Sequence, residues 1–141
     1  MGTRSLTVFH EYDAEIVVMY RQYDGYPEGH GLELAEFLLP FTVVNGLGLQ
    51  EERKVANGMG CLTAQVVAHF KEEAGNIYLY NAKTRNVGEE YIYRLSCPTK
   101  EGEIKMECWE VDYSDDRRKV FDGTPTEFIT WVKETEEQEV A

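Results

Sequence analysis

The chain has 141 residues, and its 26 acidic and 14 basic side chains give a formal net charge of −12. This charge repels phosphate backbones and anionic membranes at long range, so it argues against nucleic acid and membranes as partners. Hydrophobic residues make up 43% of the chain and aromatic residues 12%. Such a composition is typical of a globular domain, and the length suits a single core.

The cysteines give no sign of a cross-linked or metal-bound protein. Cys61, Cys97 and Cys108 are odd in number and lack Cys-x-x-Cys spacing, which argues against a disulfide framework and a zinc site. The chain also has no apolar run of roughly 18 residues and no apolar N-terminal signal segment. We therefore expect a soluble, cytoplasmic protein with free thiols.

The N-terminal residues predict a β-hairpin. Ser5–Glu11 alternate between the two faces of a strand, and Ile16–Tyr23 are rich in β-branched and aromatic residues. Antiparallel pairing across the intervening turn would place Arg4 nearly opposite Asp24. We expect these two residues to form a partly buried ion pair.

A turn that is dense in polar and aromatic residues follows the hairpin, over Tyr20–Gly31. Asp24-Gly25 is a turn signal, and Pro27 fixes φ shortly after it. Irregular backbone between a strand and a helix is a frequent place for a binding site. A structural turn whose aromatic side chains close the end of the core explains the same residues.

Two stretches in the first third of the chain resemble a known family. The chain begins Met-Gly-Thr-Arg-Ser, and Tyr20–Pro27 fit the pattern Tyr-x-x-aromatic-Asp-Gly-Tyr-Pro. Both are similar to a family of small uncharacterised proteins of bacteriophages and bacteria. The resemblance implies a bacterial or phage-host cell and no particular activity. Many relatives have His-Trp before the Asp-Gly, where this chain has Gln22-Tyr23, so a role that needs that imidazole is not carried over.

The middle of the chain predicts two helices separated by a long loop. The first helix should run from His30 to Leu39, because Pro40 cannot continue it. Phe41–Gly60 is glycine-rich and predicts a loop of the kind that forms a lid or a binding loop, although Val43-Val44 could be a short strand. The second helix should span Cys61–Ala74.

The C-terminal half has a hydrophobic period of two, which indicates an antiparallel meander. A phase shift in the third strand predicts a β-bulge near Cys108-Trp109. The last strand leaves an edge that could pair across a two-fold axis, so a homodimer is one expectation. The four predicted strands are Ile77–Tyr80, Glu90–Cys97, Glu103–Tyr113 and Arg118–Phe121.

The last helix has a clear start signal. Thr124 as N-cap, Pro125 at the first helical position and Glu127 three residues after the cap form a capping box, worth about 1 kcal/mol. We expect one domain over 1–133 and a flexible acidic tail over 134–141. The predicted fold class is α+β, with the N-terminal hairpin and the C-terminal meander in one antiparallel sheet and about three helices mainly on one face.

The favoured functional hypothesis is a non-enzymatic protein that binds a small anionic ligand or a host protein at the Tyr20–Gly31 turn. Two arginines could clamp a carboxylate or phosphate, and the tyrosines offer faces for stacking. No cofactor is implied, and no metal site is expected, because His-x-x-x-His and repeated Asp-x-Asp are absent. The candidate binding residues are Arg4, Tyr20, Arg21, Tyr23, Asp24, Tyr26 and His30.

Two other functions fit the sequence less well. A small hydrolase or transferase would use His30 as general base, with Asp24 orienting it, but no motif fixes that geometry. An acidic inhibitor that mimics nucleic acid ranks last, because the acidic residues are interspersed with Lys and Arg.

Overall fold

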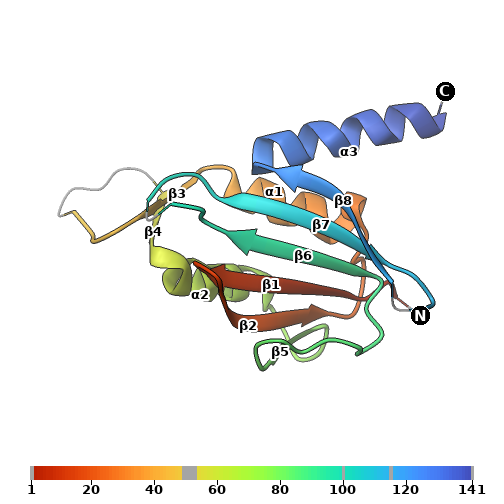
Figure 1. The fold of residues 1–141 in the computed structure, drawn as a ribbon, viewed down its shortest axis with the longest axis horizontal. Coiled ribbons are helices and arrows are strands. Elements are labelled where there is room, and N and C mark those ends of the chain that lie inside the picture. The colour runs from red at the N-terminus through yellow and green to blue at the C-terminus, as the bar shows by residue number, and fades with distance from the viewer. Residues whose placement is uncertain (1, 49–53, 100, 115, 141) are drawn as a thin grey trace.

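The computed structural model describes residues 2–48, 54–99, 101–114 and 116–140. Within them, three helices accompany a six-stranded mixed sheet that is mainly antiparallel, which confirms the predicted α+β class. The strand order is β5-β2-β1-β6-β7-β8 (Figure 1). The strands are β1 (Ser5–Glu11), β2 (Ala14–Arg21), β5 (Ile77–Tyr80), β6 (Tyr91–Ser96), β7 (Lys105–Val111) and β8 (Arg117–Gly123).

The predicted N-terminal hairpin is present, with Ser5 opposite Arg21 and Glu11 opposite Ala14. The way in which this hairpin joins the C-terminal strands differs from the prediction. β6 pairs with β1 in parallel, and β5 pairs with β2 at the far edge of the sheet, so only β6, β7 and β8 form a meander.

Side-chain packing explains the place of β5. The ring of Tyr20 on β2 lies 5.9 Å from that of Tyr78 and 5.8 Å from that of Tyr80, between ring centroids. Aromatic pairs at this distance stabilise neighbouring strands. A period of two identifies Ile77–Tyr80 as a strand, but it does not say which strand lies beside it.

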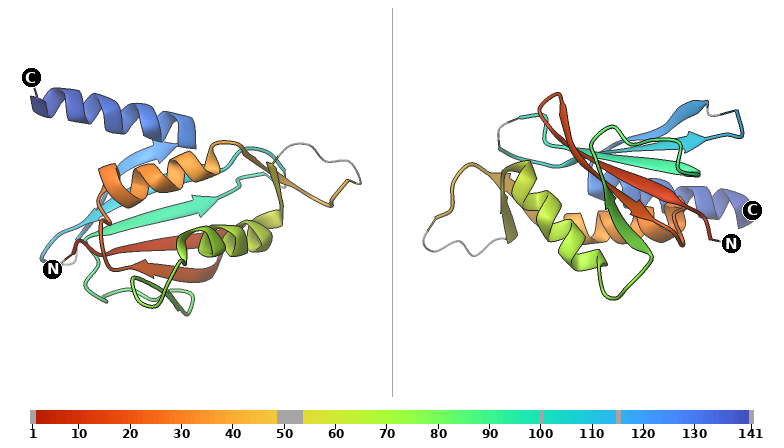
Figure 2. Two further views of the ribbon diagram at one scale, coloured as in Figure 1. Left: turned by 180° about the vertical axis from the view of Figure 1, so that it is seen from behind. Right: turned by 90° about the horizontal axis from the view of Figure 1, so that it is seen from below.

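The helices α1 (Leu32–Leu38), α2 (Gly58–Phe70) and α3 (Pro125–Val140) lie on one side of the sheet. Figure 2, seen from behind, shows α1 and α2 across that face, and α3 packs against α1 and β8. The main core fills the space between the helices and the sheet. Its largest fully buried side chains include Phe9, Met19, Leu34, Leu62, Tyr93 and Phe128.

The helix bounds differ from the prediction at their ends. The first predicted helix begins as a π-helical turn, η1 (Pro27–Gly31), and becomes α-helical only at Leu32. α2 starts at Gly58 and ends at Phe70, and α3 continues through the acidic residues as far as Val140. Among the described residues, none of these helices has the length and apolar character needed to cross a membrane.

The long loop predicted for Phe41–Gly60 is wrong over much of its length. β3 (Phe41–Val44) and β4 (Lys54–Asn57) form a two-stranded parallel ladder, and α2 already begins at Gly58. Residues 49–53 of the predicted loop lie outside the described residues. β3 confirms the alternative of a short strand at Val43-Val44. β4 was not predicted, because a strand of four residues is too short for a hydrophobic period to stand out.

Two local predictions in the C-terminal half are confirmed. The register of β7 against β8 shifts between Cys108 and Trp109, as expected for a β-bulge. The capping box is formed in both directions: Thr124 N donates to Glu127 Oε1 at 2.9 Å, and Glu127 N donates to Thr124 Oγ1 at 3.2 Å. Both features depend on neighbours in the chain, so local sequence is enough to predict them.

Replacing Thr124 by Ala should lower the free energy of unfolding by about 1 kcal/mol, because the Glu127 amide loses its acceptor. Urea denaturation followed by circular dichroism measures the loss. Thr126→Ala is the matched control, since Thr126 is exposed in the first turn of the same helix. An equal change in both variants would contradict a specific role for the cap.

Candidate functional site

The structure brings two of the predicted site residues together inside the protein. Arg21 ends β2, His30 lies in η1, and the two side chains meet on the helix-covered side of the sheet. Arg21 Nη1 donates to His30 Nδ1 at 3.1 Å, and His30 Nε2 lies 2.8 Å from Thr7 Oγ1. Because a guanidinium only donates, Nδ1 accepts and Nε2 carries the proton of the neutral ring. His30 therefore donates to Thr7.

Arg21 makes further contacts that satisfy its charge. Its Nη1 also donates to Glu33 Oε2 at 2.9 Å, and its Nε donates to the Tyr23 carbonyl at 2.6 Å. The arginine is 8% exposed, whereas the Glu33 side chain is 51% exposed. Thr7, Arg21, His30 and Glu33 together are called the Arg21–His30 cluster below.

His30 is completely buried, between the rings of Phe70 at 4.9 Å and Tyr93 at 5.4 Å. Burial and the adjacent Arg21 charge lower the pKa of His30 from 6.5 to about 3. The imidazole is therefore neutral near pH 7, and both of its nitrogens already have partners. A general base needs access to a substrate proton, and this ring has none.

Asp24 does not orient the His30 ring. It adopts a positive φ of 61°, and its backbone carbonyl accepts from His30 N at 2.7 Å. Its side chain points to a different partner, since Tyr26 Oη donates to Asp24 Oδ1 at 3.5 Å. The contact between Asp24 and His30 therefore shapes the turn and supplies no acid–base pair.

The remaining predicted residues do not converge on the cluster. Tyr20 faces the other side of the sheet, where it packs with Leu6, Val8 and Ile92. Tyr23 and Tyr26 are 50% and 37% exposed. The predicted Arg4–Asp24 ion pair is absent from the salt bridges that join described residues.

A backbone hydrogen bond holds the turn against the start of β1 without that ion pair. Gly25 N donates to the Thr3 carbonyl at 2.9 Å, so main chain, and not a charge pair, joins the turn to the start of β1. Arg4 instead lies along the segment before β6, where a Cβ added at Gly88 would meet its Nη1 at 3.0 Å. Strand register places residues opposite each other but does not decide the direction of long side chains.

Thr7 and Glu33 are site residues that the sequence analysis missed. Glu33 stands one helical turn after His30, which is a usable signal for a carboxylate on the same face. Thr7 lies 23 residues from His30 and has no such signal, because only the pairing of β1 with β2 brings it near. Tyr93 also supports the turn, since its Oη donates to the Gly25 carbonyl at 2.7 Å.

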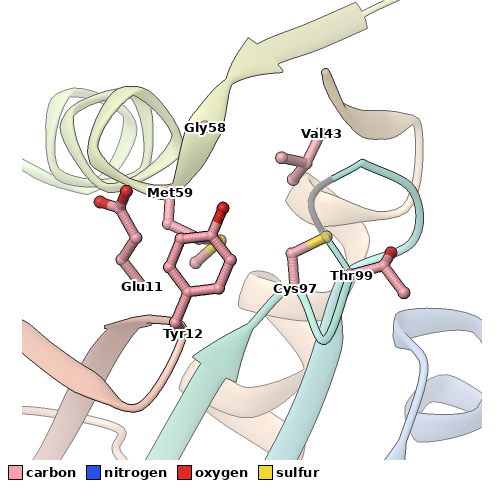
Figure 3. Close-up of a pocket in the computed structure, with 7 residues that line it drawn as sticks. All are labelled: Glu11, Tyr12, Val43, Gly58, Met59, Cys97 and Thr99. Atoms are coloured by element: carbon pink, nitrogen blue, oxygen red, sulfur yellow. The ribbon is translucent and has the colours of Figure 1, made fainter. Parts of the chain in front are cut away.

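A hollow of about 150 Å³ lies beside the cluster. Its charged lining consists of Arg21, Glu33 and Glu72, so carboxylates outnumber the one guanidinium. That charge balance does not suit an anionic ligand. A second hollow, drawn in Figure 3, lies between the β1–β2 turn and the start of α2 and has about 30 Å³, room for little more than a water molecule.

No group of three or more potential metal-ligating residues occurs in the described parts of the chain. Comparisons of the chain with protein-family models, curated proteins and solved structures gave no match.

Gly31 is required by close packing and not by backbone conformation. Its φ of −57° is open to any residue, but a Cβ there would lie 2.7 Å from Phe128 Cζ and 2.9 Å from Tyr93 Cε1. Both rings are fully buried and cannot move away freely. Gly31→Ala should therefore lower the free energy of unfolding by about 1–3 kcal/mol in urea denaturation.

Gly60→Ala is the matched control for that prediction. Gly60 lies within α2, and a Cβ there would meet nothing within 4 Å. Alanine should raise the free energy of unfolding by about 0.5–1 kcal/mol at this position. If both variants shifted stability in the same direction, the packing argument at Gly31 would be wrong.

The buried His30 should make the protein less stable in mild acid. The unfolded chain gains a proton as pH falls below 6.5, whereas the folded state resists until about pH 3. The free energy of unfolding is therefore unaffected by His30 protonation above pH 6.5. Below that pH it decreases by up to about 1.4 kcal/mol per pH unit. Urea denaturation at several pH values between about pH 7 and pH 5 measures this loss. Most carboxylates titrate below that range and so contribute little to it.

His30→Gln removes the titrating group while keeping one donor and one acceptor. Its free energy of unfolding should change less with pH than that of the wild type over the same range. His10, whose pKa burial and Arg94 also lower, is present in both proteins and cancels in the comparison. Parallel pH profiles would contradict the neutral, buried state of His30.

Proposed function

We propose that this chain is a non-enzymatic binding protein that captures an extended segment of a protein partner at the edge strand β5, beside the Tyr20–Gly31 turn. The observation that carries the proposal is the character of that edge. β5 reads Ile-Tyr-Leu-Tyr without a charge, and Tyr78, Leu79 and Tyr80 are 44%, 54% and 38% exposed. Exposed, uncharged edge strands invite pairing with another chain.

The opposite edge of the sheet has the contrary character. β8 begins Arg117-Arg118-Lys119, and charged side chains of this kind protect an edge from unwanted pairing. The predicted homodimer contact at Arg118–Phe121 is therefore a weaker candidate than an association through β5. If a second copy of the chain is the partner, the uncharged edge favours β5 as the contact.

The turn holds β5 in place. Gln22 N and Tyr23 N donate to the carbonyl and the side-chain Oδ1 of Asn76, at 2.9 and 3.1 Å. Lys71 Nζ also donates to the Ile77 carbonyl, at 2.9 Å. The exposed Tyr23 thus stands next to the start of β5 on a fixed backbone. A surface that is ordered before binding loses less conformational entropy on association.

The other hypotheses have weaker support at this turn. A small anion would meet a guanidinium already bonded to Glu33 and the Tyr23 carbonyl. A hydrolase or transferase would need substrate to reach His30, which is fully buried. A protein segment needs neither an unbonded guanidinium nor access to His30, because backbone hydrogen bonds and apolar contacts supply its binding energy.

Leu79→Lys should weaken partner binding about tenfold or more, because a lysine on the edge opposes both apolar contact and strand pairing. Peptides selected from a displayed random library on the wild-type protein provide the ligand, and calorimetry measures their affinity. Leu47→Lys is the matched control, since Leu47 is 66% exposed after β3 and away from β5. It should leave the affinity unchanged.

Two further measurements locate the contact. Bound peptide should slow amide hydrogen exchange over Ile77–Tyr80, whereas protection confined to another segment would contradict the proposal. Sedimentation velocity tests the second-copy case, in which a concentration-dependent dimer is lost in Leu79→Lys and kept in Leu47→Lys.

A further inference from the structure

The face of the sheet that carries no helix, turned toward the viewer in Figure 1, has two hollows that meet at Arg94. The larger has about 420 Å³ and is mainly polar, with His10, Lys105 and Glu107 in its wall. The smaller has about 180 Å³ and an apolar side formed by Val8, Ile92 and Trp109. A polar hollow joined to an apolar one is a common form of small-molecule site.

His10 lines the larger hollow and is bonded to Arg94. The residue is only 3% exposed, and Arg94 Nε donates to its Nε2 at 2.8 Å. Since Nε2 accepts, the neutral ring carries its proton on Nδ1. Nδ1 is buried and has no hydrogen-bond partner among the described residues. A buried donor without an acceptor is costly, so the bond from Arg94 is what holds this ring in the wall of the hollow.

Two arginines in these hollows keep guanidinium nitrogens available. Arg94 uses Nε for His10, but Nη1 has only a 3.9 Å contact with Glu107 Oε1, and the side chain is 43% exposed. Arg117 lines the smaller hollow, and its side chain forms no ion pair or hydrogen bond with another described residue. On a chain with a net charge of −12, two such arginines on one face form a local site for an anion.

Neighbouring cations serve as a contrast, because each already has an acid partner. Arg85 donates to Glu15 through both Nη atoms, at 2.5 and 3.4 Å. Lys105 Nζ lies 3.0 Å from Asp122 Oδ1. These ion pairs hold side chains at the rim of the hollows. Arg94 and Arg117 are therefore the residues that can bind an anion.

The apolar side is equally well held. Val8 is fully buried and Ile92 is 5% exposed, so both form the floor beneath the smaller hollow. Trp109 Nε1 donates to Glu107 Oε1 at 3.0 Å, which fixes the indole beside Arg94. An aromatic wall next to a guanidinium can hold a flat apolar body while the charge is bound.

We infer that this face binds a small organic anion with an apolar or aromatic body. The Arg94 guanidinium holds the carboxylate or phosphate, and Arg117 supplies a second positive charge. The body lies on Trp109, above Val8 and Ile92. This site is separate from the β5 edge, and its occupancy does not depend on a protein partner.

Calorimetry with four probes tests the ligand class on the whole chain. Phenylacetate and phenyl phosphate carry both the anion and the ring, inorganic phosphate carries only the charge, and benzyl alcohol carries only the ring. The two ring-bearing anions should bind at least about tenfold more tightly than either partial probe. If phenylacetate and phenyl phosphate bind with different affinities, the tighter of the two shows whether the site prefers a carboxylate or a phosphate. Equal binding of benzyl alcohol, or no binding of either anion, would overturn the inference.

Variants on β8 and β6 locate the site. Arg117→Gln should weaken phenylacetate or phenyl phosphate binding about threefold to tenfold, and Arg94→Lys, which keeps the charge but loses the fork, about tenfold. Arg118→Gln is the matched control: Arg118 is the adjacent residue, its side chain is 76% exposed, and it pairs with Glu110. It should bind as the wild type does.

Arg117 and Arg118 both lie on the exposed edge strand, so neither change should affect folding. Nuclear magnetic resonance of the Trp109 indole and the Arg94 Nε should show shifts on titration with the tighter anion. Equal affinity in Arg117→Gln and Arg118→Gln, together with unshifted Trp109 and Arg94 signals, would exclude the site.

Discussion

The Arg21–His30 cluster is the constraint on which the first half of the fold depends. It joins β1 through Thr7, β2 through Arg21, η1 through His30 and α1 through Glu33. A guanidinium that is 8% exposed is tolerated only because acceptors surround it, and a neutral imidazole is one of them. The wide π-turn places that imidazole under the sheet, and Gly31 lets the turn approach the rings of Tyr93 and Phe128. The residues that first suggest catalysis therefore stabilise the fold.

The two faces of the sheet differ in whether their polar groups are bonded within the protein. The helix-covered face holds the main core and encloses the Arg21–His30 cluster, so its polar groups are consumed by internal bonds. The other face has a smaller apolar cluster that includes Leu6, Val8 and Ile92, and charged side chains cover it. There guanidinium nitrogens of Arg94 and Arg117 remain available, so the molecule's strongest signs of ligand binding lie where no helix packs.

The two proposed surfaces use different physical interactions. At the edge strand β5, exposed apolar side chains and backbone groups suit a partner that is itself a polypeptide. At Arg94, local positive charge on an acidic protein suits a small anion and would be weakened by salt. The surfaces lie on one sheet, in which β2 and β1 separate β5 from β6, the strand that carries Arg94.

The sequence by itself determined what depends on nearby residues: the N-terminal hairpin, the capping box at Thr124, the β-bulge at Cys108-Trp109 and the α+β class. It also selected Arg21 and His30, since polar residues in a strand-to-helix turn stand out. Tertiary structure alone decided that β5 pairs with β2, that β6 runs parallel to β1, and that Arg94 meets His10 across 84 residues. The physical reason is the separation along the chain over which each interaction acts. Hydrophobic period and capping act over a few residues, whereas strand neighbours and the direction of long side chains follow from packing between segments far apart in the chain.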